Sequence, residues 1–381
     1  MDFKYTEVQE STRKMVRDFA DRELAPGAAE RDRDARFDPK LYNRLGDLGI
    51  CGMRFPEEFG GSNTDFLSWC LALEEIGRVD LSLSWTLFVG IGGAVRVVRG
   101  GEEHRQRWKD SVIVPTVRGE ALCAAGITEP GAGSDTSAIQ TAAVEEDGEW
   151  VINGTKVLST NAGSELCCAA TVVCLTDREK KEFTTIIVPT GTPGFTTSAP
   201  YRKMGLKSSY TGELVFEDCR VPLANAVSER GLGRKKTVEY LAEGRIQLSS
   251  TAIGLHQACA DESLKYARER IAFKRPLSQF QHVQAMLVEI ALNLELSRLL
   301  RDKAATMVDD GERVMQHASM VKWFACESAI KASKDALQVF GGIGFLDETP
   351  VSRYYRDIRA ATLADGATEI QKWIIARELG C

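Results

Sequence analysis

The sequence predicts an α+β multidomain protein in which one β region separates two helical regions. Apolar residues recur at helical spacing over about the first 118 residues, and this spacing returns from about residue 235 to the end. Between these regions, runs of β-branched residues alternate with turn residues. A chain of 381 residues is too long for one small domain. We therefore expect three domains, at residues 1–118, 119–230 and 231–381.

The first region is predicted to be helical because its apolar residues recur in a charged background. Segments 41–48 and 66–76 continue this pattern, and prolines with the Gly60-Gly61 pair interrupt it. The opening recurrence consists of Val8, Met15, Val16, Phe19 and Leu24.

The middle region is predicted to form strands at residues 150–158, 166–175, 183–189 and 213–216. Asn153-Gly154 and similar pairs supply turn residues between or beside them. In the last region, residues 283–307 and 318–340 have the period of long amphipathic helices.

The composition is that of an ordinary soluble globular protein, with 44% hydrophobic and 27% charged residues. A net charge of −6 gives no basic field for nucleic acid or an anionic membrane. The N-terminus has no secretory signal pattern, and no apolar stretch approaches the ~20 residues of a membrane helix. Ten scattered cysteines without a CxxC spacing, with four histidines, predict no metal site and a reducing compartment.

The segment ITEPGAGSD, residues 127–135, is the first with chemical potential. Three consecutive small residues let backbone N–H groups approach a ligand closely. The hydroxyls of Thr128 and Ser134 can bind a polar heterocycle or a phosphate. Taken alone, the segment is also explained as a glycine-rich turn between a helix and a strand.

Four further segments stand out, and each alone has an ordinary explanation. The Gly341-Gly342 pair could end a helix, Arg270 could form a surface ion pair, and Asp365 could cap a helix. The segments are KVLSTNAG (156–163), RIAF (270–273) with the following PLSQFQ (276–281), QVFGGIGF (338–345) and RYYRDIRAATLADGATEIQ (353–371).

Together, in this order and at these separations, the segments closely resemble the acyl-CoA dehydrogenase family over nearly the whole chain. The resemblance implies an N-terminal α-helical domain, a middle β-barrel-like domain and a C-terminal four-helix-bundle domain, assembled as a homotetramer. It also implies FAD-dependent α,β-dehydrogenation of an acyl-CoA thioester, with electron-transferring flavoprotein as the electron acceptor. The expected location is the cytoplasm, or the mitochondrial matrix in a eukaryote.

The resemblance assigns FAD-binding roles in two groups. One group would contact the flavin and pyrophosphate, while the other would hold the adenosine half from a neighbouring subunit. The first group is Ile127, Thr128, Gly133, Ser134, Leu158, Ser159 and Thr160, with Ala367 and Glu369 meeting the FAD again. The second group is Arg270, Phe273, Gln281, Gln338, Gly341 and Gly342.

The resemblance also implies the substrate contacts. Ser134, Arg245 and the segment KSSYT (207–211) would place the CoA portion, and Gly366 would lie against the thioester. Two positions depart from the family pattern, because Leu158 replaces a frequent aromatic residue and Ala367 replaces a frequent hydroxyl. We expect altered FAD affinity or potential from these changes, with FAD still bound.

Asp365 stands where the family usually has its catalytic glutamate. The resemblance implies that this carboxylate takes the α-proton while a hydride passes from Cβ to flavin N5. Burial would raise its pKa toward the operating range. Some relatives place their glutamate at the position of Gly244, so Glu243, one residue away, is a second candidate base.

An aspartate at this position suggests an alicyclic or branched acyl group, as in cyclohexanecarboxyl-CoA dehydrogenase-like members. Gly90, Gly92 and Gly93 would either leave room for such a group or allow close helix packing. Residues 83–95 contain no acid or base, which argues against a dicarboxylic substrate. The alternatives are an enoyl-CoA reductase, an oxidase of nitroalkanes or acyl-CoA, and a flavin-binding paralogue without turnover.

Overall fold

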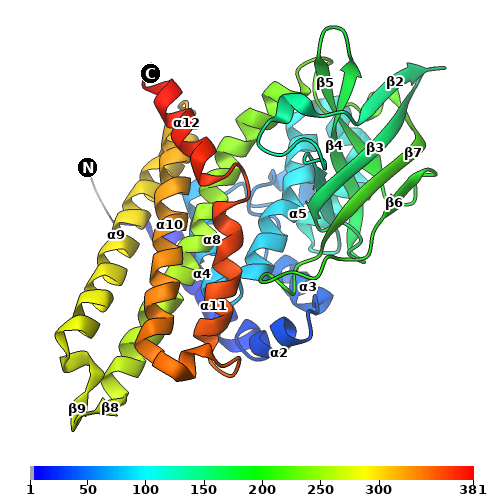
Figure 1. The fold of residues 1–381 in the computed structure, drawn as a ribbon. Coiled ribbons are helices and arrows are strands. Elements are labelled where there is room, and N and C mark those ends of the chain that lie inside the picture. Colours follow the sequence, from blue (N-terminus) through cyan, green and yellow to red (C-terminus); the bar gives the residue numbers. More distant parts are fainter. Residues whose placement is uncertain (1–3) are drawn as a thin grey trace.

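In the computed structural model, which describes residues 4–381, a curled sheet lies beside two helical domains (Figure 1). The predicted helical–β–helical order is confirmed. The proposed domain boundaries fall between α7 (Val114–Val117) and β1 (Leu122–Gly126), at 118/119, and just before α8 (Gly233–Glu269), at 230/231.

The N-terminal domain is helical as predicted, and its helices begin at residues that cap them. Thr6 and Gln9 form a reciprocal capping box at α1, while Asp65 and Asp80 accept backbone N–H groups at the starts of α4 and α5. The helices are α1 (Glu7–Phe19), α2 (Ala28–Arg33), α3 (Pro39–Asp47), α4 (Phe66–Val79), α5 (Leu81–Arg99), α6 (Glu102–Trp108) and α7 (Val114–Val117).

Helix α5 corrects the expectation that no apolar stretch approaches membrane length. It has 19 residues and is apolar enough to cross a membrane by composition alone. However, it is almost entirely buried among other elements, because it packs against α4, α8 and β1. Its apolar character is therefore that of a core helix.

The middle domain is a seven-stranded sheet in the order β1-β4-β2-β3-β7-β6, with β5 paired to β4. The four predicted strands are confirmed, and the last of them is longer than predicted because it pairs with β3 along most of its length. The strands are β1 (Leu122–Gly126), β2 (Ala142–Glu146), β3 (Glu149–Thr160), β4 (Cys167–Asp177), β5 (Glu182–Pro189), β6 (Phe195–Thr197) and β7 (Thr211–Pro222).

The C-terminal domain is built on three long helices, and both predicted long helices are confirmed. Helix α10 packs against α8, α9, α11 and α12. The elements are α8 (Gly233–Glu269), the short strands β8 (Ile271–Ala272) and β9 (Arg275–Pro276), α9 (Gln281–Asp309), α10 (Met315–Phe340), α11 (Pro350–Ile358) and α12 (Thr368–Glu378).

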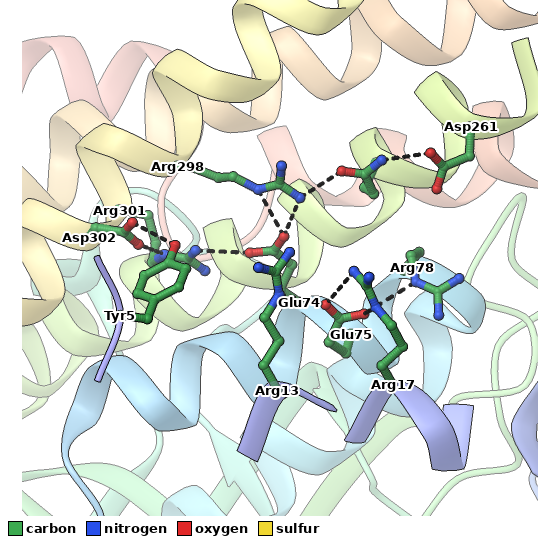
Figure 2. A network of polar contacts seen from close by, with 11 residues as sticks. Tyr5, Arg13, Arg17, Glu74, Glu75, Arg78, Asp261, Arg298, Arg301 and Asp302 are labelled. Carbon is green, nitrogen blue, oxygen red and sulfur yellow. Dashed lines mark hydrogen bonds and ion pairs between the residues drawn. The ribbon is translucent and has the colours of Figure 1, made fainter. Parts of the chain in front are cut away.

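A buried ionic network joins α4 to α1 and α9 (Figure 2). Glu74 accepts from Arg298 at 2.6 Å and from Arg301 at 2.9 Å. Its neighbour Glu75 is bound by Arg17 at 2.8 Å and by Arg13 at 3.0 Å. Both glutamates are almost fully buried, so their charges are satisfied by paired arginines, as buried charges require.

Helix α4 also approaches α8 very closely, because glycine stands at the contact. A Cβ at Gly254 would lie 2.0 Å from the backbone oxygen of Glu74. This contact fixes α8 against the N-terminal domain, and α8 in turn contacts α5 and β5. Helix α8 of the C-terminal domain therefore packs against both the N-terminal domain and the middle domain.

Candidate active site

Asp365 and Gly366 form a turn just before α12, and side chains from three helices hold that turn. Arg245 of α8 donates to the Asp365 backbone oxygen at 3.2 Å. Gln371 of α12 donates to the same oxygen at 3.0 Å and to the Gly366 oxygen at 2.7 Å. Lys322 of α10 donates to the Gly366 oxygen at 2.8 Å. The backbone oxygens of Asp365 and Gly366 thus accept hydrogen bonds, while the Asp365 side chain accepts none from these three residues.

The turn requires left-handed backbone conformations at both residues. Gly366 has φ +89°, and a Cβ there would lie 2.8 Å from Nε2 of Gln371, so glycine is needed. Asp365 has φ +50°, a conformation that aspartate tolerates better than most residues. The local sequence Asp-Gly therefore fits the turn that presents the carboxylate.

The Asp365 carboxylate forms no hydrogen bond or ion pair with any of residues 4–381. Burial raises the pKa of Asp365 above its usual value, and the charges of Arg245, Lys322 and Arg96 oppose that rise. A raised pKa and a free acceptor are the properties that a general base needs. Gly244 of α8 lies next to the carboxylate, because a Cβ there would be 3.1 Å from Oδ2 of Asp365.

Asp365 lines an inner cavity of about 70 Å³ between α5, α8 and the sheet. Apolar residues from α5 and the end of β1 form much of its wall. The lining residues used below are Phe88, Gly92, Arg96, Tyr240, Gly244 and Asp365.

The space beside the α5 glycines is occupied by neighbouring side chains. A Cβ at Gly92 would lie 2.4 Å from the Tyr240 hydroxyl oxygen, and one at Gly93 would lie 2.5 Å from Cβ of Cys123. A Cβ at Gly90 would meet Cβ of Leu122 at 3.0 Å. Of the two explanations open at the sequence level, this geometry supports close packing.

Glu243, the second candidate base, is held away from the inner cavity. Its carboxylate oxygens bind Arg99 at 2.8 and 2.9 Å and Arg54 at 3.2 Å. It lines a larger outer cavity of about 560 Å³, which shares Arg96 and Tyr240 with the inner one. Both oxygens of this carboxylate are already engaged by arginines, so neither is free to approach a substrate in the inner cavity.

The residues predicted to meet the flavin in the middle domain lie together at the ends of β1 and β3. The backbone N–H of Val157 donates to Thr128 O at 2.9 Å, which ties the two segments together. The β3–β7 register shifts between Lys156 and Ser159, and Leu158 stands there 64% exposed. Ile127 and Thr160 are half-buried, while Gly133 and Ser134 are exposed on the adjoining loop.

This surface fits a flavin. The Ser159 hydroxyl is buried and has no hydrogen-bond partner within residues 4–381. Exposed Leu158 offers an apolar face beside it, and a Cβ at Gly133 would meet no atom within 4 Å. An unsatisfied polar atom next to an exposed apolar side chain is what a polar heterocycle would cover.

A buried ion pair beneath this loop was missed by the sequence reasoning. Lys156 donates to Glu129 at 2.8 Å, and Glu129 also accepts the backbone N–H groups of Gln140 and Thr141. Glu129 lies in the ITEPGAGSD segment and Lys156 in the KVLSTNAG segment, but neither segment by itself indicates that the two residues pair. The pair anchors the ITEPGAGSD loop to β2 and β3.

The residues predicted to hold the adenosine half lie at the far end of the C-terminal domain. Figure 1 places β8 and β9 at the opposite end of the long helices from α12 and away from the sheet. Phe273, between these strands, is 90% exposed. The remaining members of the group are all exposed near this end: Arg270, Gln281, Gln338, Gly341 and Gly342.

The remaining predicted residues divide between the turn and a packed segment. Ala367 and Glu369 lie at the start of α12, next to Asp365. In the KSSYT segment, Ser209 is buried and its hydroxyl accepts from Thr86 at 2.9 Å. This segment packs on α5, so none of its side chains is fully exposed, and Lys207 is half-buried.

Family models match all three domains. The acyl-CoA dehydrogenase N-terminal domain matches residues 6–120, the middle domain residues 124–219 and the C-terminal domain residues 231–380. Among curated relatives, a probable acyl-CoA dehydrogenase YngJ of Bacillus subtilis is 39% identical over 100% of both chains. The mitochondrial short-chain specific acyl-CoA dehydrogenase of Mus musculus is 38% identical over 98% of this chain and 90% of its own.

Solved structures agree with the family models. Butyryl-CoA dehydrogenase from Megasphaera elsdenii superposes with a TM-score of 0.95 at 34% identity, over 100% of both chains. A chain from a structure described as the electron transferring flavoprotein of Acidaminococcus fermentans gives a TM-score of 0.96 at 36% identity, over 100% of this chain and 99% of that one.

Proposed function

The chain belongs to the acyl-CoA dehydrogenase family, and from this premise we propose that it oxidises short-chain acyl-CoA thioesters with Asp365 as the base. The observation that supports this role is the free Asp365 carboxylate in a small, largely apolar cavity. Acyl-CoA dehydrogenation removes the α-proton and a hydride from Cβ, which leaves a trans double bond conjugated to the thioester.

Asp365 would take the α-proton onto a carboxylate oxygen. Its turn is fixed by Arg245, Gln371 and Lys322, so little motion is needed to reach the substrate. The absence of a side chain at Gly244 leaves space beside Oδ2. Members of this family are FAD-dependent, and FAD supplies the hydride acceptor when bound.

For the flavin, we propose the surface formed by Thr128, Leu158, Ser159 and Thr160. The unsatisfied Ser159 hydroxyl would gain a partner there, and Leu158 would be covered. The residues predicted to hold the adenosine half, at the far end of the C-terminal domain, would bind the FAD of a second subunit. The homotetramer of this family provides that subunit, and electron-transferring flavoprotein is the electron acceptor we expect.

The cavity favours a short acyl chain over the ring that Asp365 suggests from the sequence. Its volume of about 70 Å³ is roughly half that of an engineered apolar cavity of about 150 Å³ that binds benzene. Tyr240 fills the space that Gly92 leaves open. The relatives named short-chain specific and butyryl-CoA dehydrogenases are consistent with this size. Because its relatives include bacterial and mitochondrial enzymes, we place the protein in the cytoplasm or the mitochondrial matrix.

An anaerobic titration of the flavin-containing protein tests this proposal. We expect butyryl-CoA to bleach the flavin faster than octanoyl- or cyclohexanecarboxyl-CoA. Asp365→Asn keeps the side-chain size and should lower the bleaching rate by about 10³-fold or more. Glu243→Gln is the matched control and should bleach at close to the wild-type rate.

Other outcomes would redirect the assignment. If Glu243→Gln abolished bleaching and Asp365→Asn did not, Glu243 would be the base. Reoxidation of reduced flavin by an enoyl-CoA alone would indicate a reductase, and rapid turnover with oxygen or a nitroalkane would indicate an oxidase. No response to any thioester would indicate a paralogue without turnover.

A further inference from the structure

Arg96 lines the same inner cavity as Asp365 and comes from the last turn of α5. Its guanidinium carbon lies 4.2 Å from the centre of the Tyr240 ring, so the guanidinium rests over that ring. Tyr240 is itself fixed by close contact with Gly92. The arginine is therefore oriented by packing before any ligand arrives.

Apart from the Tyr240 ring, the Arg96 guanidinium has no hydrogen-bonding or ion-pairing partner among residues 4–381. Its Nη1 is buried without a hydrogen bond, and no carboxylate forms an ion pair with the side chain. Arg99, one turn further along α5, instead binds Glu243 through two hydrogen bonds of 2.8 and 2.9 Å. Asp365 attracts Arg96 electrostatically but forms no hydrogen bond or ion pair with it. A buried guanidinium without a directly bound anion is costly, so its presence in a cavity wall points to an anion that arrives with the ligand.

The charges around the cavity leave Arg96 as the available donor. Asp365 is the one carboxylate among the lining residues. Lys322 donates to the backbone oxygens of Thr362 and Gly366, and Arg245 donates to the Asp365 backbone oxygen and to the Met315 sulfur. These two cations therefore hold the turn, while Arg96, in the wall shared by the inner and outer cavities, keeps a buried Nη1 without a hydrogen bond.

We propose that Arg96 binds a second carboxylate, carried on the acyl group of a short dicarboxylic acyl-CoA. This proposal rests on the proposed function and names its substrate class. A guanidinium binds a carboxylate through two parallel hydrogen bonds, which gives both affinity and orientation. Residues 83–95 contain no acid or base, and Arg96 is the next residue along.

The test compares acyl-CoAs of equal carbon number on the flavin-containing enzyme. Succinyl-CoA is paired with butyryl-CoA, and glutaryl-CoA is paired with valeryl-CoA, with flavin bleaching and kcat/KM as readouts. We expect the dicarboxylic member of at least one pair to be preferred by wild type. Arg96→Met should lower kcat/KM for that substrate on the order of 100-fold and for its neutral partner by much less.

Two further variants control for charge and folding. Arg96→Lys keeps the charge without the planar fork and should fall between wild type and Arg96→Met. Arg99→Met changes a neighbouring arginine that is already paired, so it should leave the dicarboxylic preference in place. Bound flavin and the unfolding temperature of each variant show whether the fold is retained.

The phosphates of CoA are the other source of an anion, and N-acetylcysteamine thioesters lack them. A dicarboxylic preference that persists with these thioesters and disappears in Arg96→Met supports the proposal. Equal losses for both CoA substrates, which vanish without CoA, would assign Arg96 to a phosphate and overturn it. Efficient bleaching by butyryl-CoA with no dicarboxylic preference would also overturn it while leaving the proposed function intact, whereas no bleaching at all would count against that function.

Discussion

Asp365 depends on residues that never touch its carboxylate. Lys322 is fully buried on α10 and donates to the carbonyls of Thr362 and Gly366, on either side of Asp365. Its charge also lowers the pKa of Asp365 against the larger effect of burial, which raises it. Lys322 is therefore a positioning residue with an electrostatic effect on the base.

Replacing Lys322 should therefore move the pH profile as well as the rate. In Lys322→Met the pKa of Asp365 rises further, and because the base acts when ionised, the acidic limb of kcat/KM should shift to higher pH. We expect the rate at neutral pH to fall roughly 10-fold, since the turn also loses two hydrogen bonds. The measurement is the pH–rate profile of wild type and variant. A lower rate with an unmoved acidic limb would show that Lys322 acts only by holding the turn.

At the scale of elements, Glu74 joins α4 to α9 through Arg298 and Arg301 (Figure 2). Burial opposes ionisation of Glu74, but the two arginines outweigh it and lower its pKa to about 2. The folded pKa lies below the unfolded value, so this contribution is present above about pH 4.5 and is lost as pH falls toward about 2. The shift corresponds to a stabilisation on the order of 3 kcal/mol.

Glu74→Gln should reduce the free energy of unfolding by about 3 kcal/mol at neutral pH, because it leaves two arginines without their buried anion. The difference from wild type should shrink as pH falls from 4.5 to 2. Urea unfolding at several pH values measures both effects. Glu146→Gln removes one of the two exposed carboxylates paired with Arg220 and should change stability by at most about 1 kcal/mol. Equal losses in the two variants would contradict the role given to burial.

For the whole molecule, assembly and FAD binding should be coupled. The exposed Phe273 stands between β8 and β9, which Figure 1 shows at the end of the C-terminal domain remote from the sheet, so we expect it to serve a neighbouring chain. We expect Phe273→Asp to lower the tetramer fraction and the bound FAD together. Light scattering and the ratio of flavin to protein absorbance measure the two quantities. Val144→Asp places the same charge on exposed β2 and should change neither. Full FAD content in a dissociated Phe273→Asp protein would exclude the shared site.

The sequence was sufficient where local pattern carries the information. Helical spacing predicted α9 and α10, and β-branched runs predicted β3, β4 and β5. It did not predict β1, whose sequence LCAAG has no β-branched residue and forms a strand because it pairs in parallel with β4. The predicted strand at 213–216 is longer in the structure, as β7, because pairing with β3 supplies hydrogen bonds along most of its length.

The sequence by itself determined the order of the domains, the family motifs and the identity of the residue at the position of the base. Only the tertiary structure decided what surrounds that base. It brought Lys322 and Arg245 from distant helices to the Asp365 turn, filled the space beside Gly92 with Tyr240, and left Arg96 unpaired in the cavity wall. The physical reason is that these effects arise from contacts, burial and charge between residues far apart in the chain, which no local spacing encodes.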